Sequence, residues 1–412
     1  MILFFTLPAL AVSSWEADGR LSAYVLPNFQ YLYTDQTNRQ NHYLRSRLLL
    51  NHHKKITQRF SFEMELELFN TQLLGEPPSS QNSLFTSSRT THGQWHEVWP
   101  RKFLLSMTTQ KSKLSFGFQP FHWGLGIWAN DGKDDSWFGT SRGGDINLRL
   151  AGATLPLRRS TVSLFAFGDM VTRSDTISIY NNHRGYNALF GIHSGKENNS
   201  WGFIGGVQWQ DGTKVLPFDF FFEKRFMNSW SIGNETIYIF DDKHRIGSVL
   251  QAKIQSKPFG FGADLGFTSG DFGKIGTMRL HSDHNAGILL FEQIIPLSLH
   301  DEDYSTNNGQ ISNSLYFHGL MQYQYRNFAL RYGYLNARSV FENLQQNGIG
   351  TEQIVSFRWR KKDLFTACIE GAVFTPHEPY ETVGVIWGVH TRMQFQISRE
   401  STKRQSQETP PW

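Results

Sequence analysis

The chain alternates apolar and polar residues with a period of two over most of its length. Between Phe60 and Leu68, one set of alternate positions holds only apolar residues, and the other holds only Ser and Glu. A helix would mix the two sets around its circumference, whereas a strand separates them onto its two faces. The pattern therefore predicts β-strands that are apolar on one face and polar on the other.

The alternating segments run for about 10 to 13 residues, which exceeds the roughly 5 to 6 residues usual in soluble domains. Tilted strands that cross a membrane need about 9 to 11 residues. Aromatic residues make up 15% of the chain, yet hydrophobic residues reach only 39%. A soluble β-sandwich or propeller would share this composition. The strand length instead favours an all-β, transmembrane antiparallel β-barrel with lipid outside and water inside.

The connections between these segments fall into two kinds. Short turns are expected near residues 52–55, 109–111, 155–159, 195–199, 227–228, 257–258, 326–327 and 360–363. Longer connections are expected at 71–97, 121–144, 171–184 and 335–350. Short turns on one side of the membrane and longer loops on the other are typical of outer-membrane barrels.

One segment decides the strand count. Taking every alternating segment as a strand gives about 19 strands and breaks the alternation of short and long turns. Leaving residues 285–297 out gives about 18 strands, with both chain ends on the periplasmic side. Residues 269–312 then form one inserted connection, which we expect to fold into the lumen as a constriction loop. The alternatives are that this segment is an extra strand, or that a strand elsewhere is miscounted.

The two ends of the chain differ from the predicted barrel. Residues 1–14 hold an apolar stretch followed by small residues, which is typical of a signal peptide. No Lys or Arg follows Met1, which leaves a start further upstream open, and a buried first strand is the alternative interpretation. The barrel is expected over residues 15–397 and a polar tail over 398–412. No other segment approaches about 18 consecutive apolar residues, which excludes transmembrane helices.

Two parts of the sequence carry a family resemblance. The segment from Gly117 to Gly132, GFQPFHWGLGIWANDG, resembles a signature of uncharacterised proteobacterial outer-membrane barrels. These are porin-like and loosely similar to alginate-export proteins. The stretches 268–271 and 284–292 resemble the same group. The resemblance implies a barrel of about 18 strands with a channel-like role, and it brings no catalytic residues. One departure is that the last strand ends near Ile397, without the usual closing aromatic residue.

Charged residues on the polar face would line the lumen. The alternation points six arginines inward, and barrel closure would bring them onto one arc of the wall: Arg45, Arg47, Arg331, Arg358, Arg360 and Arg392. The inward acidic face consists of Glu63, Glu65, Glu67 and Glu370. Arginines offer sites for carboxylate or phosphate groups, and charged rings set the selectivity of a pore. The alternative is a wall whose charges satisfy one another, with Asp219 and Glu223 among the acidic partners.

Metal sites are only weakly indicated. His281, Asp283 and His284 are close in sequence and could suit zinc or a similar ion. The stretch 131–135 offers oxygen ligands for calcium but does not match an EF-hand. Solvated polar clusters are common in long loops, so we expect no bound metal and no cofactor.

Catalysis is also weakly indicated. The sequence has no Gly-x-Ser-x-Gly motif, and His318 and His390 face inward, away from lipid substrates. Cys368 is the single cysteine, so no intrachain disulfide can form. We interpret it as an ordinary small residue on the inward face. The chain is therefore not expected to be an enzyme.

These features favour a passive channel of porin or exporter type in the outer membrane of a Gram-negative bacterium. Its solutes would be small or polymeric and anionic. The expected partners are outer-membrane lipid, lipopolysaccharide and the diffusing solute, and scattered basic residues argue against nucleic acid. One alternative is an outer-membrane scaffold or adhesin-like barrel with a sealed lumen, and a second is an outer-membrane hydrolase. The sequence does not decide the oligomeric state or the direction of flux.

Overall fold

The structure is a computed structural model of the 412-residue chain. It describes residues 13–27, 29–30, 37–38, 42–74, 98–132, 138, 144–156, 161–173, 185–196, 199–210, 212–226, 229–281, 284, 286–291, 311–340, 348–361, 364–378 and 384–400. Most of the expected signal peptide and most of the expected polar tail lie outside these ranges. No helix in the described part of the chain is long and apolar enough to cross a bilayer.

Eighteen strands form one antiparallel sheet. They are β1 (Ser13–Val25), β4 (His42–Lys55), β5 (Phe60–Leu74), β6 (Val98–Thr108), β7 (Ser112–Pro120), β8 (Ile146–Thr154), β9 (Val162–Arg173), β10 (Gly185–Lys196), β11 (Asn199–Gln210), β12 (Thr213–Phe226), β13 (Trp230–Phe240), β14 (His244–Ser256), β15 (Phe259–Thr268), β16 (Ser314–Tyr325), β17 (Phe328–Ser339), β18 (Gly348–Lys361), β19 (Phe365–Pro376) and β20 (Ile386–Glu400). The short strands β2 (Phe29–Gln30) and β3 (Thr37–Asn38) pair with each other in the connection that joins β1 to β4.

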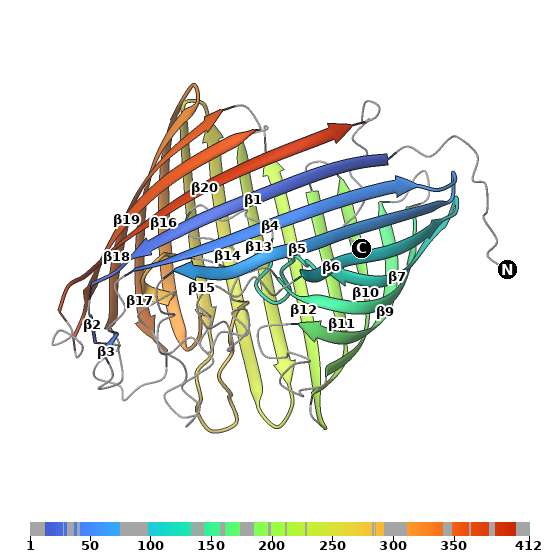
Figure 1. The fold of residues 1–412 in the computed structure, drawn as a ribbon. Coiled ribbons are helices and arrows are strands. Elements are labelled where there is room, and N and C mark those ends of the chain that lie inside the picture. The colour runs from blue at the N-terminus through green and yellow to red at the C-terminus, as the bar shows by residue number, and fades with distance from the viewer. Residues whose placement is uncertain are drawn as a thin grey trace.

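The sheet closes on itself because β1 pairs with β20 on one side and with β4 on the other. Figure 1 shows β1, in blue, lying beside β20, in red. The pairing sets Ser14 opposite Glu400, so the first and last strands begin and end at the same rim. Closure leaves no unpaired sheet edge, which a chain in lipid requires. The predicted all-β barrel of about 18 strands is confirmed.

Exposure alternates along the strands as the sequence pattern predicts. On β16, Leu315 and Phe317 are each 45% exposed, whereas Tyr316 and His318 are 1% and 2% exposed. The apolar set therefore lies on the outer face of the barrel, where lipid would cover it. One turn lies later than predicted, because β4 continues to Lys55 and β5 begins at Phe60.

The inside of the barrel holds a large apolar cluster. Two connections contribute side chains to this cluster. One joins β7 to β8, and the other joins β15 to β16. The first contributes Ile127 and Phe138, and the second contributes Met278, Leu280, Ala286, Ile288, Leu289, Leu290, Phe291 and Ile311. These side chains pack against inward residues of the wall, including Ile237, Tyr316 and Ile354.

Candidate channel lumen

The strand register brings the predicted arginines onto neighbouring strands. Arg358 on β18 lies opposite Cys368, which lies opposite Arg392 on β20. Arg392 lies opposite Ser22 on β1, and Ser22 lies opposite Arg45 on β4. A short distance along the strands, a second row runs through Arg360, Thr366, Gln394, Arg20 and Arg47. The side chain of Arg45 lies outside the described residues, so only its backbone position is known.

Arg331 on β17 joins this group from the neighbouring row. It lies opposite Ser356, and its Nε donates to Gln322 Oε1 over 2.8 Å. Arg331, Arg358 and Arg392 are close enough to repel one another electrostatically. We call Arg20, Arg47, Arg331, Arg358, Arg360 and Arg392 the arginine arc. Its members lie on five strands, β17, β18, β20, β1 and β4, and β19 lies between β18 and β20 without contributing an arginine.

A small polar cluster separates the arginines on β18 and β20. Glu370 Oε2 lies 2.8 Å from His390 Nδ1, and the His390 ring stacks on Tyr24 with 4.2 Å between ring centroids. Ser356 Oγ donates to Glu370 Oε1 over 3.3 Å and lies 3.3 Å from Cys368 Sγ. The predicted acidic residue Glu370 is therefore inward and buried, with His390 as a hydrogen-bond partner.

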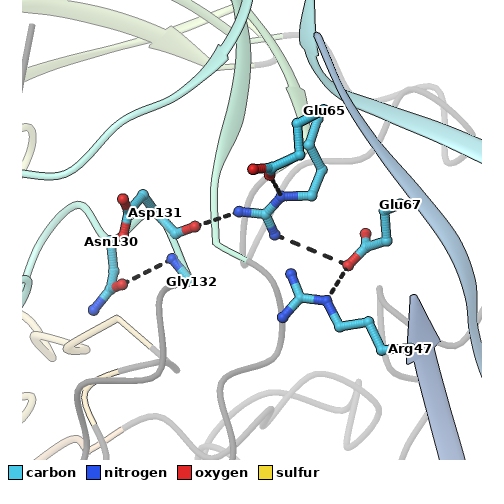
Figure 2. Close-up of polar contacts among 7 residues, drawn as sticks. Arg47, Glu65, Glu67, Asn130, Asp131 and Gly132 are labelled. Atoms are coloured by element: carbon cyan, nitrogen blue, oxygen red, sulfur yellow. Dashed lines mark hydrogen bonds and ion pairs between the residues drawn. The ribbon is translucent and has the colours of Figure 1, made fainter. Parts of the chain in front are cut away.

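The acidic residues of β5 have basic partners on both sides (Figure 2). Glu67 Oε1 lies 2.6 Å from Arg47 Nε, and Glu65 Oε1 lies 2.6 Å from Arg101 Nε on β6. Glu63 pairs with Lys102, also on β6. The sequence pattern places the arginine partners of β5 on β4 alone. It misses Arg101 because a bulge opposite Glu65 and Leu66 shifts the alternation of β6.

Arg101 also joins the wall to the connection between β7 and β8. Its Nη2 donates to the carbonyl oxygen of Asp131 over 2.5 Å. Beside it, Gly132 N donates to Asn130 Oδ1 over 2.9 Å.

Another part of the wall holds the same connection through two buried carboxylates. Trp123 Nε1 donates to Asp219 Oδ1 on β12 over 2.8 Å. The backbone N–H groups of Leu125 and Ile127 donate to Glu235 Oε2 on β13. The connection is therefore attached to the wall at β6, β12 and β13.

Two glycines let this connection fold tightly. Gly124 has a φ of +55° and Gly126 a φ of +78°, a region that side chains with a Cβ rarely adopt. A Cβ on Gly124 would also lie 2.6 Å from Glu235 Oε2. The glycine-rich signature seen in the sequence is thus the part of the chain that presents its backbone amides to Glu235.

The weak metal candidates are held by other partners. His281 Nε2 lies 3.3 Å from Asp145 Oδ1, and His284 Nε2 lies 3.0 Å from the Tyr316 hydroxyl. Burial lowers the pKa of His284 from 6.5 to about 4. Asp283 lies outside the described residues. Across the ranges that the structure describes, no group of three or more His, Cys, Asp and Glu could hold a metal ion.

Comparisons with known proteins identify the fold. No protein-family model and no curated protein matches the chain. Among solved structures, it is similar to Pseudomonas aeruginosa OccK5 (OpdH), with a TM-score of 0.58 at 10% identity, covering 94% of this chain and 98% of that one. A BenF-like porin from Pseudomonas fluorescens Pf-5 gives 0.58 at 8% identity, covering 95% and 100%.

A third solved structure similar to this chain is Pseudomonas aeruginosa OpdK with vanillate. It gives a TM-score of 0.55 at 10% identity, covering 93% of this chain and 99% of that one. At these identities the likeness shows the fold, which is that of a porin-type barrel of the Gram-negative outer membrane. The closed sheet and its apolar outer face agree with that location.

Proposed function

We propose that the chain is a passive channel of the outer membrane. The observation that carries this proposal is the arginine arc, a set of charged side chains on the inner wall of a closed barrel. Charges at such positions act on solutes inside a pore and have no role toward lipid. The likeness in fold to the BenF-like porin supports the same function.

The solutes that fit this wall are small anions, or anionic groups of larger molecules. A guanidinium matches carboxylate and phosphate in geometry and charge, and the arc presents several within neighbouring rows. Weak attraction at several positions lets a solute enter and also leave. The likeness in fold to OpdK, a structure of which contains the carboxylate vanillate, supports this class of solute.

Two connections narrow the lumen in this proposal. The segment 121–132 is fixed to Glu235 and Arg101 on separate parts of the wall. The segment 278–291, of which the structure describes residues 278–281, 284 and 286–291, contacts it, since His281 N donates to the Ile127 carbonyl oxygen over 2.8 Å. Together they bury apolar side chains inside the barrel, so the free cross-section is much smaller than the barrel itself.

A sealed scaffold is the second candidate, because the same apolar cluster reaches from β13 to β20. Planar-bilayer recording of the refolded protein separates the two. A channel gives steady single-channel currents, with a reversal potential in a KCl gradient that indicates preference for chloride. A sealed barrel gives no current at any voltage that the bilayer withstands, and that result would overturn the proposal.

A further inference from the structure

Glu352 on β18 accepts hydrogen bonds from three consecutive backbone amides of the segment 278–291. Ile288 N and Leu289 N donate to Glu352 Oε1 over 2.8 Å and 3.0 Å, and Leu290 N donates to Oε2 over 2.8 Å. The Glu352 side chain is fully buried. Successive backbone N–H groups around an oxygen form an anion-binding nest, and here the anion belongs to the barrel wall.

The packing around this nest is tight on both sides of the segment. A Cβ on Gly287 would lie 2.6 Å from Glu352 Oε2, so any larger residue here would displace the carboxylate from the amides. On the other side of the segment, Leu289 reaches β20, because a Cβ on Gly388 would lie 2.7 Å from Leu289 Cδ2. The three amides and this one leucine fix where the segment lies against β18 and β20 inside the barrel.

The amides define the position of the segment more narrowly than its apolar contacts do. Hydrogen bonds to an ionised acceptor are stronger than neutral ones, and buried amides that lose their acceptor carry a desolvation cost. The apolar contacts are non-directional and would permit several positions of the segment. A single carboxylate thus selects one position among those that packing allows.

We propose that Glu352 is the positioning residue that sets the width of the pore, by holding the segment 278–291 in one place against the inner wall. The proposal rests on the channel function proposed above. Glu352 acts through the backbone of residues 288–290 and not on the solute itself. The segment loses its fixed position when the carboxylate is replaced.

The first experiment compares Glu352→Gln with Glu370→Gln in planar bilayers. Both glutamates are fully buried and face inward on adjacent strands, but Glu370 pairs with His390 of the wall. Glutamine replaces one of the two carboxylate oxygens with an NH2 group, which cannot accept a hydrogen bond. At least one of the backbone N–H groups of residues 288–290 therefore loses its acceptor. We expect Glu352→Gln to change single-channel conductance roughly twofold or more and to shift the size limit for polyethylene glycols, because the segment no longer has one fixed position in the pore. Glu370→Gln removes a charge beside the arginine arc and so alters conductance, but it leaves the size limit unchanged. An equal shift of the size limit in both variants would overturn the proposal.

The second experiment reads the position of the segment without any current. In a Cys368→Ser background, cysteines replace Leu289 and Gly388, and a short bis-thiol reagent links them in the folded protein. With Glu352 present the pair cross-links quickly. Glu352→Gln slows the reaction by roughly tenfold, the factor expected when the bound position loses one hydrogen bond to a charged acceptor. Circular dichroism confirms that each variant keeps its β-structure.

The two readouts separate the proposals. Slower cross-linking with no current in any variant would leave Glu352 as the positioning residue and overturn the channel function. Equal cross-linking rates with Glu352 intact and with Glu352→Gln would overturn the positioning role, even if the protein conducts. Failure of the pair to react when Glu352 is present would also overturn it, because Leu289 would then not lie against β20.

Discussion

The indole of Trp123 donates a hydrogen bond to the carboxylate of Asp219, with 2.8 Å between Nε1 and Oδ1. Trp123 lies in the connection between β7 and β8, and Asp219 lies on β12, 96 residues further along the chain. Both side chains are buried, and the Trp123 ring also packs edge-on against Phe221 with 5.0 Å between ring centroids. This pair fixes one end of the segment 121–132 to the wall.

Trp123→Phe tests that attachment. Phenylalanine fills part of the same space but leaves the Asp219 carboxylate without the indole donor, at a cost of about 1–3 kcal/mol. We expect a lower unfolding midpoint in urea and noisier single-channel currents. Trp209→Phe, on the outer face of β11 and 41% exposed, is the matched control and should change neither. Identical midpoints and noise in the two variants would contradict this role for Trp123.

The ion pair between Arg47 and Glu67 should be strongly coupled. Arg47 is 6% exposed and Glu67 is 1% exposed, so removing one partner leaves a buried charge. Breaking such a pair costs about 3–5 kcal/mol, whereas replacing both partners costs much less. Arg101 lies 3.9 Å from Glu67 and will offset part of the loss. A double-mutant cycle with Arg47→Met and Glu67→Met, measured by unfolding in urea, tests this. We expect the double variant to lose less free energy of unfolding than the two single variants lose together. Simple additivity would contradict the coupling.

The arginine arc should set ion selectivity. Replacing Arg331 or Arg358 with serine removes one charge from the inner wall, which lowers the chloride-to-potassium permeability ratio by a factor of roughly two to five. The reversal potential in a KCl gradient measures this ratio. Arg225→Ser is the control, because Arg225 is an exposed arginine on β12, outside the arc, beside Glu223. An equal shift from Arg225→Ser would mean that total charge, and not the arc, determines selectivity.

The binding of the segment 278–291 to the inner wall of the barrel should weaken in mild acid. Burial lowers the pKa of His284 to about 4, so the docked segment keeps this imidazole neutral between pH 6.5 and about 4. The released segment takes up a proton in that range, which favours release as the pH falls. The charged and titratable groups that act on His284 are Asp264, His318, His281 and Lys253, and the Tyr316 hydroxyl contacts it.

Cross-linking of the Leu289→Cys and Gly388→Cys pair as a function of pH measures this release. We expect the rate, corrected for thiol ionisation, to fall between about pH 6.5 and 4, and His284→Gln to flatten that dependence. An unchanged pH profile in His284→Gln would show that another of the neighbouring groups is responsible.

Much of the fold follows from local pattern, because a period of two combined with strand length is a property of each segment alone. The alternation on β16 and β20 predicts which side chains face lipid, and the structure agrees. The strand count also follows, since short and long turns must alternate around a closed barrel.

The contacts inside the barrel depend on information that no single segment holds. Arg20 joins the arc because β1 pairs with both β20 and β4, and nothing in its local pattern singles it out. Arg101 points inward because of a bulge. Asp219, Glu235 and Glu352 hold backbone and side-chain donors from distant connections, which pattern alone could not place. Their one local signal is a single carboxylate on an inward face among apolar neighbours.

The measurement that tests the channel most directly is the single-channel current of the refolded protein in a planar bilayer, with the reversal potential in a KCl gradient. We predict steady conductance with preference for chloride, reduced when Arg331 and Arg358 are replaced by serine. A folded barrel that passes no current, or that prefers potassium and is indifferent to these two replacements, would contradict a passive anion channel.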